Sequence, residues 1–260
     1  MPLRFITMQI RDAVVLITGA SEGIGKACAM LLRQRGAKVS LSGLETPEFQ
    51  SGEIDGTLIT TGDITDPSAR QELVSRTINR FSRIDVLINN AGVGLYATPS
   101  EVPTDLSKRL FDINVFAAAS LAQETIPHMK RLGRGMIIHM GSVGGYVSLP
   151  WAVMYCASKF ALHAYSDSLR RELNGTGIHV MKVCPGIVNT DFRKHVLGGT
   201  APRRIADIKR VVSPQEVAKS VLWGIEHNAR VVYVPKIGKL FTVLEYLSPA
   251  LMDWYLSRKW

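Results

Sequence analysis

The stretch AVVLITGASEGIGKACAMLLRQR, residues 13–35, decides the fold of this chain. Residues 13–18 form a short apolar run typical of a buried strand, and residues 25–35 have the periodicity of a helix. Between them, glycines follow one another with the spacing G-x3-G-x-G. Glycine allows a tight turn and a close backbone approach to a ligand, and a helix N-terminus attracts phosphate. The stretch predicts a strand–loop–helix unit that binds a dinucleotide pyrophosphate; the alternative is a plain flexible turn.

The same alternation of apolar runs and helical patterns continues along the chain. Continuous apolar strands between helices are typical of a parallel sheet covered on both faces. We therefore predict an α/β fold, a Rossmann-type doubly wound parallel sheet of about seven strands in a single domain. Residues 1–236 would form the catalytic domain and residues 237–260 a C-terminal helical extension of it. The expected strands are 13–18, 37–43, 56–63, 84–92, 133–142, 177–186 and 230–236, and the expected helices are 25–35, 67–81, 105–132, 152–174 and 213–228.

Composition sets the class of protein and its compartment. The 260 residues are 46% hydrophobic and 20% charged, which is ordinary for a globular protein. Cys28, Cys156 and Cys184 have neither CxxC spacing nor a histidine cluster, so we expect no metal site. With no long apolar run in the sequence, we expect a cytoplasmic protein in a reducing compartment.

The net charge of +9 raises the question of an anionic partner. The positive charges are scattered, and no zinc-finger or RNA-binding signature accompanies them, so we do not expect nucleic-acid binding. We interpret the charge as an aid to solubility and an attraction for an anionic cofactor or substrate. The densest group of cations is Arg193, Lys194, Arg203, Arg204, Lys209 and Arg210.

The adenosine end of the dinucleotide site leaves NAD and NADP both open. An acid at the tip of the second strand usually holds the ribose of NAD, and a basic residue there takes the phosphate of NADP. Here the strand ends in Gly43 and Leu44, with Glu45 slightly late. Glu22 in the glycine loop would repel a phosphate, so electrostatics lean to NAD. Asp63 could accept a hydrogen bond from adenine, or it could simply cap a turn.

Six motifs in order along the chain resemble the short-chain dehydrogenase/reductase family in its compact form. They are TGASEGIG (18–25), NNAG (89–92), the asparagine of FDINVF (111–116), the serine of GSVGG (141–145), YCASK (155–159) and PGIVNT (185–190). The resemblance covers about residues 13–234. It implies NAD(P)-linked oxidation of alcohols or reduction of carbonyls, on a small-molecule carbonyl or alcohol substrate.

The tyrosine and lysine of YCASK lie one helical turn apart, on one face of a helix. A neighbouring ammonium favours the phenolate, so we expect Lys159 to lower the pKa of Tyr155 and make it a useful general acid and base. Ser142, 13 residues earlier, could stabilise the developing charge on the substrate oxygen. The resemblance adds that Lys159 bonds the nicotinamide ribose and that Asn114 belongs to a water-linked proton relay. A structural kink is the other interpretation of Asn114.

The remaining cofactor residues are carried over from the resemblance onto matching positions. The small residues of NNAG would let the backbone pass the adenosine ribose, and PGIVNT, including Ile187, would bind the nicotinamide carboxamide. The full expected set is Gly19, Ser21, Glu22, Gly23, Ile24, Gly25, Gly43, Leu44, Asp63, Ile64, Asn90, Ala91, Gly92, Tyr155, Lys159, Pro185, Gly186, Val188 and Thr190.

The substrate region is placed by position alone. Residues 191–212 fall where the family has a substrate lid, and their cations suggest an anionic or polar carbonyl substrate; a solvated loop explains them as well. An otherwise apolar pocket would be lined by Val143, Gly144, Tyr146, Leu149, Trp151, Leu95 and Tyr96.

The tail, residues 237–260, mixes large apolar residues with basic ones. We favour a helical pair packed over the substrate mouth, or a contact in a homodimer or homotetramer, above peripheral membrane contact. Pro249 argues against a single long helix. A non-catalytic dinucleotide sensor or scaffold is the rival from another class of protein, and an epimerase or dehydratase is the rival among enzymes.

Overall fold

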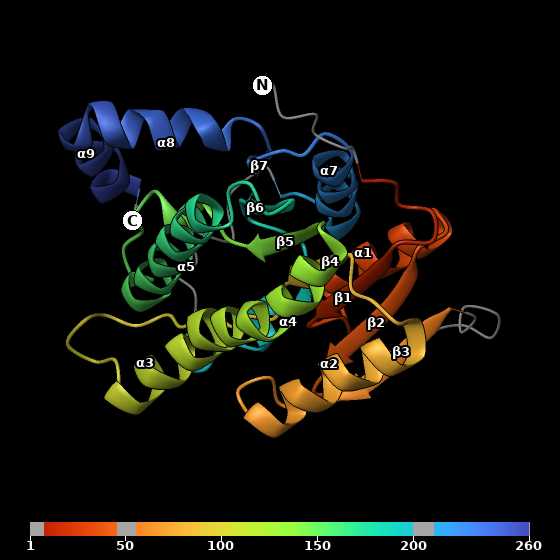
Figure 1. The fold of residues 1–260 in the computed structure, drawn as a ribbon. Helices are drawn as coiled ribbons and strands as arrows, with labels where there is room; N and C mark the ends of the chain where they lie inside the picture. The colour runs from red at the N-terminus through yellow and green to blue at the C-terminus, as the bar shows by residue number, and fades with distance from the viewer. Residues whose placement is uncertain (1–7, 46–55, 200–210, 260) are drawn as a thin grey trace.

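The computed structural model describes residues 8–45, 56–199 and 211–259. Seven strands form one sheet in the order β3-β2-β1-β4-β5-β6-β7, and every neighbouring pair is parallel (Figure 1). The predicted doubly wound sheet is therefore confirmed. The strands are β1 (Val14–Thr18), β2 (Lys38–Gly43), β3 (Thr57–Thr61), β4 (Val86–Asn89), β5 (Gly135–Met140), β6 (Ile178–Pro185) and β7 (Val231–Val234).

Helices cover both faces of the sheet, which is why most residues of the inner strands are apolar. On one face α1 (Gly23–Gln34) packs against α7 (Pro214–Glu226). The other face carries α2 (Pro67–Phe81), α4 (Ala118–Leu132) and α5 (Val153–Glu172). Two separate apolar cores result, one on each side of the sheet, and each helix contributes its buried stripe to one of them.

The predicted helix over 105–132 is interrupted by a wider turn. It consists of α3 (Thr104–Phe111), the π-helical segment η1 (Asp112–Ala117) and α4, which follow one another without a break. Single π turns within α-helices are rare and are often found at functional sites. The π turn of this chain contains Asn114. Asparagine fits a regular helix poorly, and here it occupies the irregular turn.

The strand order indicates which edge of the sheet would bind a ligand. The chain moves outward from β1 to β2 and β3, then returns to β4 on the other side of β1. Ligands of such sheets bind at the carboxyl ends of the strands, next to this change of direction. The glycine loop leaves β1 at that point, and the segments after β4, β5 and β6 end at the same edge.

The chain ends in two helices, α8 (Gly238–Leu247) and α9 (Pro249–Lys259), which pack against each other at the periphery (Figure 1). The break lies at Ser248, so the predicted effect of Pro249 is confirmed. No helix within the part of the chain that the structure describes is long and apolar enough to cross a bilayer.

Candidate active site

The glycine loop after β1 is folded so tightly that two of its residues tolerate no side chain. Gly19 has a φ of +62°, and a Cβ on it would lie 2.8 Å from the Ala91 Cα. A Cβ on Gly25 would lie 2.1 Å from the Gly19 carbonyl oxygen. Gly23 also has a positive φ, of +54°. The loop therefore presents bare backbone at the start of α1, which is the cradle that a pyrophosphate requires.

The NNAG segment after β4 braces this loop. Asn90 Nδ2 donates to the carbonyl oxygens of Thr18 at 3.0 Å and of Gly19 at 2.9 Å. The Thr18 hydroxyl accepts hydrogen bonds from the amides of Asn90 and Ala91, both at 3.1 Å. The Asn90 side chain is thus committed to the shape of the loop, and what this segment offers to a ligand is the backbone of residues 90–92.

The tip of β2 is pressed against the same loop. A Cβ on Gly43 would lie 2.0 Å from Ser21 Oγ, and that hydroxyl donates to the Glu45 carbonyl at 2.8 Å. Leu44, the next residue, is 76% exposed, so its side chain is free to face a bound adenosine. Glu22 Oε1 lies 3.0 Å from His195 Nε2, and this contact links the glycine loop to the segment after β6.

Asp63, the expected adenine contact, already has partners for both carboxylate oxygens. Oδ1 accepts from the Thr65 amide at 2.9 Å, and Oδ2 pairs with Arg109. Burial pushes its pKa up, but the hydrogen bonds from Thr65 and Arg109 outweigh it and lower the pKa. The alternative interpretation of Asp63, a turn-capping residue, describes these contacts. The carbonyl of the following residue, Ile64, accepts from Arg70 at 2.8 Å.

Ser142 and Tyr155 meet where β5 ends and α5 begins. Ser142 opens the short helix η2 (Val143–Gly145), and its Oγ accepts a hydrogen bond from the Gly144 amide at 3.0 Å. The Cβ position of Gly144 lies 3.3 Å from that oxygen and 3.6 Å from Tyr155 Cε1, so Gly144 is in close contact with both side chains. The phenol and the serine hydroxyl are hydrogen-bonded.

Lys159 lies one turn further along α5, as its spacing predicts. Its side chain is buried, and Nζ donates to the Met140 carbonyl oxygen at 3.0 Å. Nζ is 5.8 Å from the centre of the Tyr155 ring. The ammonium is therefore fixed between the end of β5 and the phenol.

The expected lowering of the Tyr155 pKa is wrong for the chain as it stands. Burial raises the pKa of Tyr155, and this outweighs the opposite effect of the hydrogen bond from Ser142. Burial also lowers the pKa of Lys159 to about 8. Spacing along a helix indicates that two groups are neighbours, but it does not reveal that both have lost their water, which disfavours the charged form of each.

Asn114 is buried in the π turn, where its amide nitrogen has two hydrogen-bond acceptors and its amide oxygen has one donor. Its Oδ1 accepts from the Val93 amide at 2.9 Å, and its Nδ2 donates to the Val93 carbonyl at 3.0 Å and to Ser158 Oγ at 3.1 Å. A Cβ on Gly92 would lie 3.0 Å from Asn114 Oδ1 and 3.4 Å from Lys159 Nζ. The bare Gly92 therefore borders a space that both polar groups face.

The segment after β6 closes the other side of the site. The Gly186 amide donates to the Val234 carbonyl at 2.8 Å, which turns the chain at the end of the strand behind Pro185. Val188 forms a bridge with Val212, and Thr190 Oγ1 accepts from the Phe192 amide at 3.3 Å. The Thr190 methyl group lies 3.3 Å from the Cβ position of Gly23, so this segment reaches the glycine loop.

The expected substrate pocket is only partly assembled as predicted. Gly144 and the buried Leu95 are near the site, and Tyr96 lies close enough to raise the pKa of Tyr155. Tyr146, in contrast, faces the rings of His163 at 4.5 Å and Tyr233 at 5.9 Å. These residues lie in a short helix and the loop after it. Neither has a regular repeat, so position in the sequence alone does not predict the direction of each side chain.

Three more of the expected pocket residues lie elsewhere. Val143 packs against Gly238 at the start of α8. Leu149 lines a groove on α5 with Ser148, Val153 and Phe160, and Trp151 is 43% exposed with a φ of +65°.

Most of the cations of the expected lid lie outside the described residues. Arg203, Arg204, Lys209 and Arg210 lie outside the described residues, as does the side chain of Arg193. Lys194 is described, and it pairs with Asp191 at 2.8 Å.

Two residues near the site were not expected from the sequence. The Phe192 ring packs edge-on against Tyr155, with ring centres 6.1 Å apart. His163, two turns beyond Tyr155 on α5, is buried beside Ser142. Its place on a helix after the YCASK motif was a usable signal, because position 163 is on the same face as residues 155 and 159.

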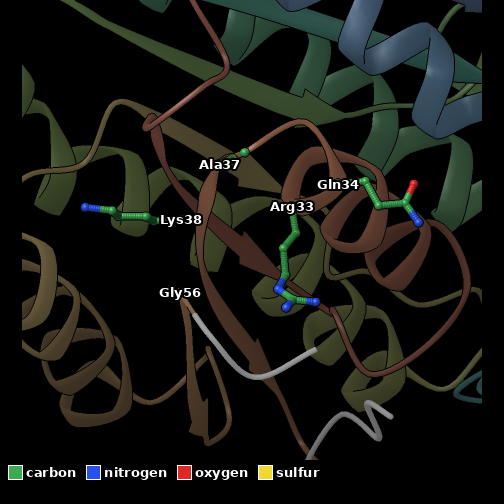
Figure 2. Close-up of a pocket in the computed structure, with 6 residues that line it drawn as sticks. Arg33, Gln34, Ala37, Lys38 and Gly56 are labelled. Atoms are coloured by element: carbon green, nitrogen blue, oxygen red, sulfur yellow. The ribbon is translucent and has the colours of Figure 1, made fainter. Parts of the chain in front are cut away.

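A separate pocket opens at the opposite edge of the sheet, where β2 begins (Figure 2). It is lined by Arg33, Gln34, Gly36, Ala37, Lys38 and Gly56. None of the predicted site residues belongs to it, and ligands of parallel sheets bind at the other edge.

Comparisons with known proteins agree with this fold. A family model described as short chain dehydrogenase matches residues 13–199. Dehydrogenase/reductase SDR family member 7B of Rattus norvegicus is 32% identical over an alignment of 258 positions, which covers 93% of this chain and 79% of that protein. Two solved structures share the fold. One is a Burkholderia phymatum short chain dehydrogenase/reductase in complex with NAD, with a TM-score of 0.83 and 21% identity, and the match covers 94% of this chain and 96% of that one. The other is a Burkholderia cenocepacia short chain dehydrogenase in complex with NADP, with a TM-score of 0.81 and 24% identity, and the match covers 96% of this chain and 99% of that one.

A parallel sheet with a glycine loop at its change of direction, joined to a Ser, Tyr and Lys cluster at the same edge, defines a class of nucleotide-dependent oxidoreductases. With the family model matching most of the chain, the chain belongs to the short-chain dehydrogenase/reductase family. It is an NAD(P)-dependent oxidoreductase.

Proposed function

We propose that this chain transfers a hydride between the nicotinamide of NAD or NADP and the carbon of a carbonyl or secondary alcohol, with Tyr155 as general acid and base. One observation carries the proposal. Tyr155, Ser142 and Lys159 come from two different elements and converge at the carboxyl edge of the sheet, next to the glycine loop. A non-catalytic sensor would have no need of a buried amine and a hydrogen-bonded phenol at that place, since burying an amine has a cost.

Each residue has a separate part in this chemistry. Nicotinamide, when bound, supplies or accepts the hydride. Ser142 donates a hydrogen bond to the substrate oxygen and stabilises its developing charge. Tyr155 gives a proton to that oxygen in reduction and takes it back in oxidation. Lys159, held by the Met140 carbonyl, keeps a positive charge beside the phenol and donates to the ribose.

Asn114 is proposed to pass protons toward Lys159 through water. The support is the π turn that holds its amide next to Val93, together with the space that Gly92 leaves between Asn114 Oδ1 and Lys159 Nζ. A water in that space would find a donor and an acceptor, which is what an ordered water requires.

The cofactor would lie along the edge formed by the glycine loop, the NNAG backbone and the segment after β6. The residues proposed to hold it are the ones predicted from the sequence. Two of them, Gly19 and Gly25, have a backbone atom 2.8 Å and 2.1 Å from the position of a Cβ, so only bare backbone fits there, as a close approach to the cofactor requires. Glu45 and Glu22 favour NAD above NADP, because a 2′-phosphate next to carboxylates is repelled.

The substrate is proposed to be a small molecule with a carbonyl or hydroxyl group. Self-association as a homodimer or homotetramer is supported by the outer face of α5 and the neighbouring η1, where Phe116, Val153 and Phe160 are exposed. A cytoplasmic setting is supported by three buried cysteines that form no disulfide.

Replacement of Tyr155 by Phe tests the proposal. The variant keeps the ring and its contact with Phe192, so NADH binding, followed by tryptophan fluorescence, should be unchanged. Turnover in a screen of carbonyl compounds should fall by about 10²–10⁴-fold, because the proton donor is gone. Tyr165→Phe is the matched control, since Tyr165 lies on the same helix and donates only to the Ala119 carbonyl at 3.3 Å. Full activity of Tyr155→Phe would refute the assignment.

A further inference from the structure

The outward face of α8 is apolar and uncovered. Leu240, Val243 and Leu247 recur at the spacing of one helical face, and Tyr246 lies beside them. All four are exposed; Tyr246 by 87% and Leu247 by 71% of their surface. Contiguous exposed apolar residues of this size usually mark a contact with a partner or a membrane.

The next helix continues the same feature. Leu251 and Trp254 are exposed on α9, each by about half of its surface, and Leu251 follows Leu247 by four residues on the other side of the break at Ser248. The guanidinium of Arg258 stacks on the Trp254 ring at 4.4 Å. An aromatic ring paired with a cation is a side-chain combination that suits the boundary between water and lipid.

The inner side of the helix pair is packed, so the exposed apolar residues of the outer side do not belong to a loosely attached tail. Met252 is buried, and the rings of Phe241 and Tyr255 are 6.3 Å apart between the two helices. α8 begins beside the active site. A Cβ built on Gly238, its first residue, would lie only 2.9 Å from Val143 Cγ2, so the start of the helix is closely packed there. The apolar face is thus presented by a fixed structure.

The charges around this face favour an anionic partner. Lys236 and Lys239 are exposed at the start of α8. Glu245, the acid of α8, is half-buried with its Oε2 shielded from solvent, and burial together with the nearby Asp253 carboxylate raises its pKa, which disfavours its charged form. Among the described residues of the pair, Asp253 on α9 is the one exposed acid. The whole chain carries a net charge of +9.

We propose that α8 and α9 dock on an anionic lipid surface, with Leu240, Val243, Leu247 and Leu251 among the acyl chains, Tyr246 and Trp254 at the headgroup level, and Lys236, Lys239 and Arg258 on the phosphates. A short helix with large apolar residues, aromatic residues and flanking cations binds in the plane of the membrane in this way. A second copy of the chain fits less well, because a symmetric contact would bring the same cations of both copies together. The proposal does not depend on the catalytic assignment.

Vesicle binding of the full 260-residue chain tests the proposal. Sedimentation with phosphatidylcholine vesicles is compared with sedimentation with vesicles that also contain phosphatidylserine. We expect binding to the anionic vesicles, weakened by salt, and a blue shift of tryptophan emission that Trp254→Phe removes. The double variant Leu240→Glu/Leu247→Glu should lose binding by at least about tenfold, because two charges would enter the apolar layer.

Trp223→Glu is the matched control, because Trp223 on α7 is also about half exposed yet lies outside the helix pair. It should bind vesicles as the wild type does, and all variants change exposed residues, so circular dichroism should show them folded. Two results would overturn the proposal: no binding to anionic vesicles at low salt, or equal loss in the control. If Leu240→Glu/Leu247→Glu lowers the oligomer mass in light scattering and leaves vesicle binding unchanged, the face is a contact between copies and the lipid proposal is wrong.

Discussion

The imidazole of His163 lies beside the backbone of Ser142, with Nε2 3.5 Å from the Ser142 amide nitrogen and 3.8 Å from Cys184 Sγ. The ring fills the space that two glycines leave open. A Cβ on Gly141 would lie 2.1 Å from Nε2, and one on Gly145 would lie 2.5 Å from Cε1. Burial lowers the pKa of His163 to about 3, so the ring is neutral at any working pH. His163 is therefore an uncharged side chain whose packing fixes the turn that carries Ser142.

From this contact we expect His163 to be a positioning residue. His163→Ala should lower kcat by roughly tenfold or more, because a small displacement of Ser142 weakens its hydrogen bond to the substrate oxygen. It should leave the KM for the cofactor unchanged, since the glycine loop is held by Asn90 and Thr18 instead. Steady-state kinetics separate the two parameters.

The control for this prediction is His163→Gln, which refills much of the space without an imidazole and should restore most of kcat. The pH–rate profiles of wild type and His163→Gln should have the same shape above pH 5, because a neutral ring adds no ionisation there. A profile that loses a limb in His163→Gln would mean that the imidazole itself transfers protons, and positioning would be the wrong role.

Lys159 gives a prediction about stability. Its pKa falls from 10.5 to about 8 on burial, which corresponds to about 3 kcal/mol of destabilisation while the amine is charged. At pH 7 Lys159→Met should remove this cost and lose the hydrogen bond to Met140, so the variant should be about 1–2 kcal/mol more stable but inactive. Urea unfolding at pH 7 measures the difference.

The sign of the pH dependence follows from the lowered pKa. Below pH 8 both folded and unfolded states bind the proton, and the cost is present in full. Between pH 8 and 10.5 the unfolded chain still binds it while the folded chain releases it, so the wild type gains stability as the pH rises. The advantage of Lys159→Met should therefore shrink toward pH 10. An advantage that stays constant from pH 7 to pH 10 would show that the folded chain binds this proton as the unfolded chain does, so that burial does not lower the pKa of Lys159.

How far the sequence predicts this protein differs between the fold and the site. The seven strands follow from apolar runs, because a strand buried on both faces can contain almost nothing else. Tyr155 and Lys159 are found from their spacing, because a helix brings residues four apart to one face. The direction of Tyr146 is not found, because it depends on His163 and Tyr233, which are distant in the sequence and come from other elements.

The charge states are also beyond a sequence pattern. The spacing of Tyr155 and Lys159 predicts attraction, but the pKa values depend on how much water each group has lost, which is a property of the packed structure. Asn90 is a similar case. Its place in NNAG indicates a ligand contact, and only the fold shows that its amide is used by Thr18 and Gly19.

Gly43 gives a prediction about the cofactor site that can be rescued. In Gly43→Ala the new methyl group would lie 2.0 Å from Ser21 Oγ, so this hydroxyl would have to move and would lose its hydrogen bond to the Glu45 carbonyl oxygen, which ties the glycine loop to the tip of β2. We expect NADH to bind about tenfold more weakly or worse in a fluorescence titration, because the cradle no longer fits the pyrophosphate. The double variant Ser21→Ala/Gly43→Ala removes the clashing oxygen and should recover affinity toward that of Ser21→Ala alone. If Gly43→Ala and Ser21→Ala/Gly43→Ala bind NADH with the same affinity, the tip of β2 does not control the conformation of the glycine loop.

The choice between NAD and NADP depends on the residues after β2. Leu44 is exposed at the strand tip and Glu45 follows it, so a 2′-phosphate there would meet a carboxylate and no cation among the described residues of this turn. We expect the wild type to bind NADH more tightly than NADPH. Leu44→Arg should strengthen NADPH binding by about tenfold, because a guanidinium forms charge-assisted hydrogen bonds with phosphate. Leu44→Gln, of similar length and without charge, should leave the preference as it is. Wild-type protein that binds NADPH as tightly as NADH would contradict this prediction, and it would place the phosphate against residues other than those at the tip of β2.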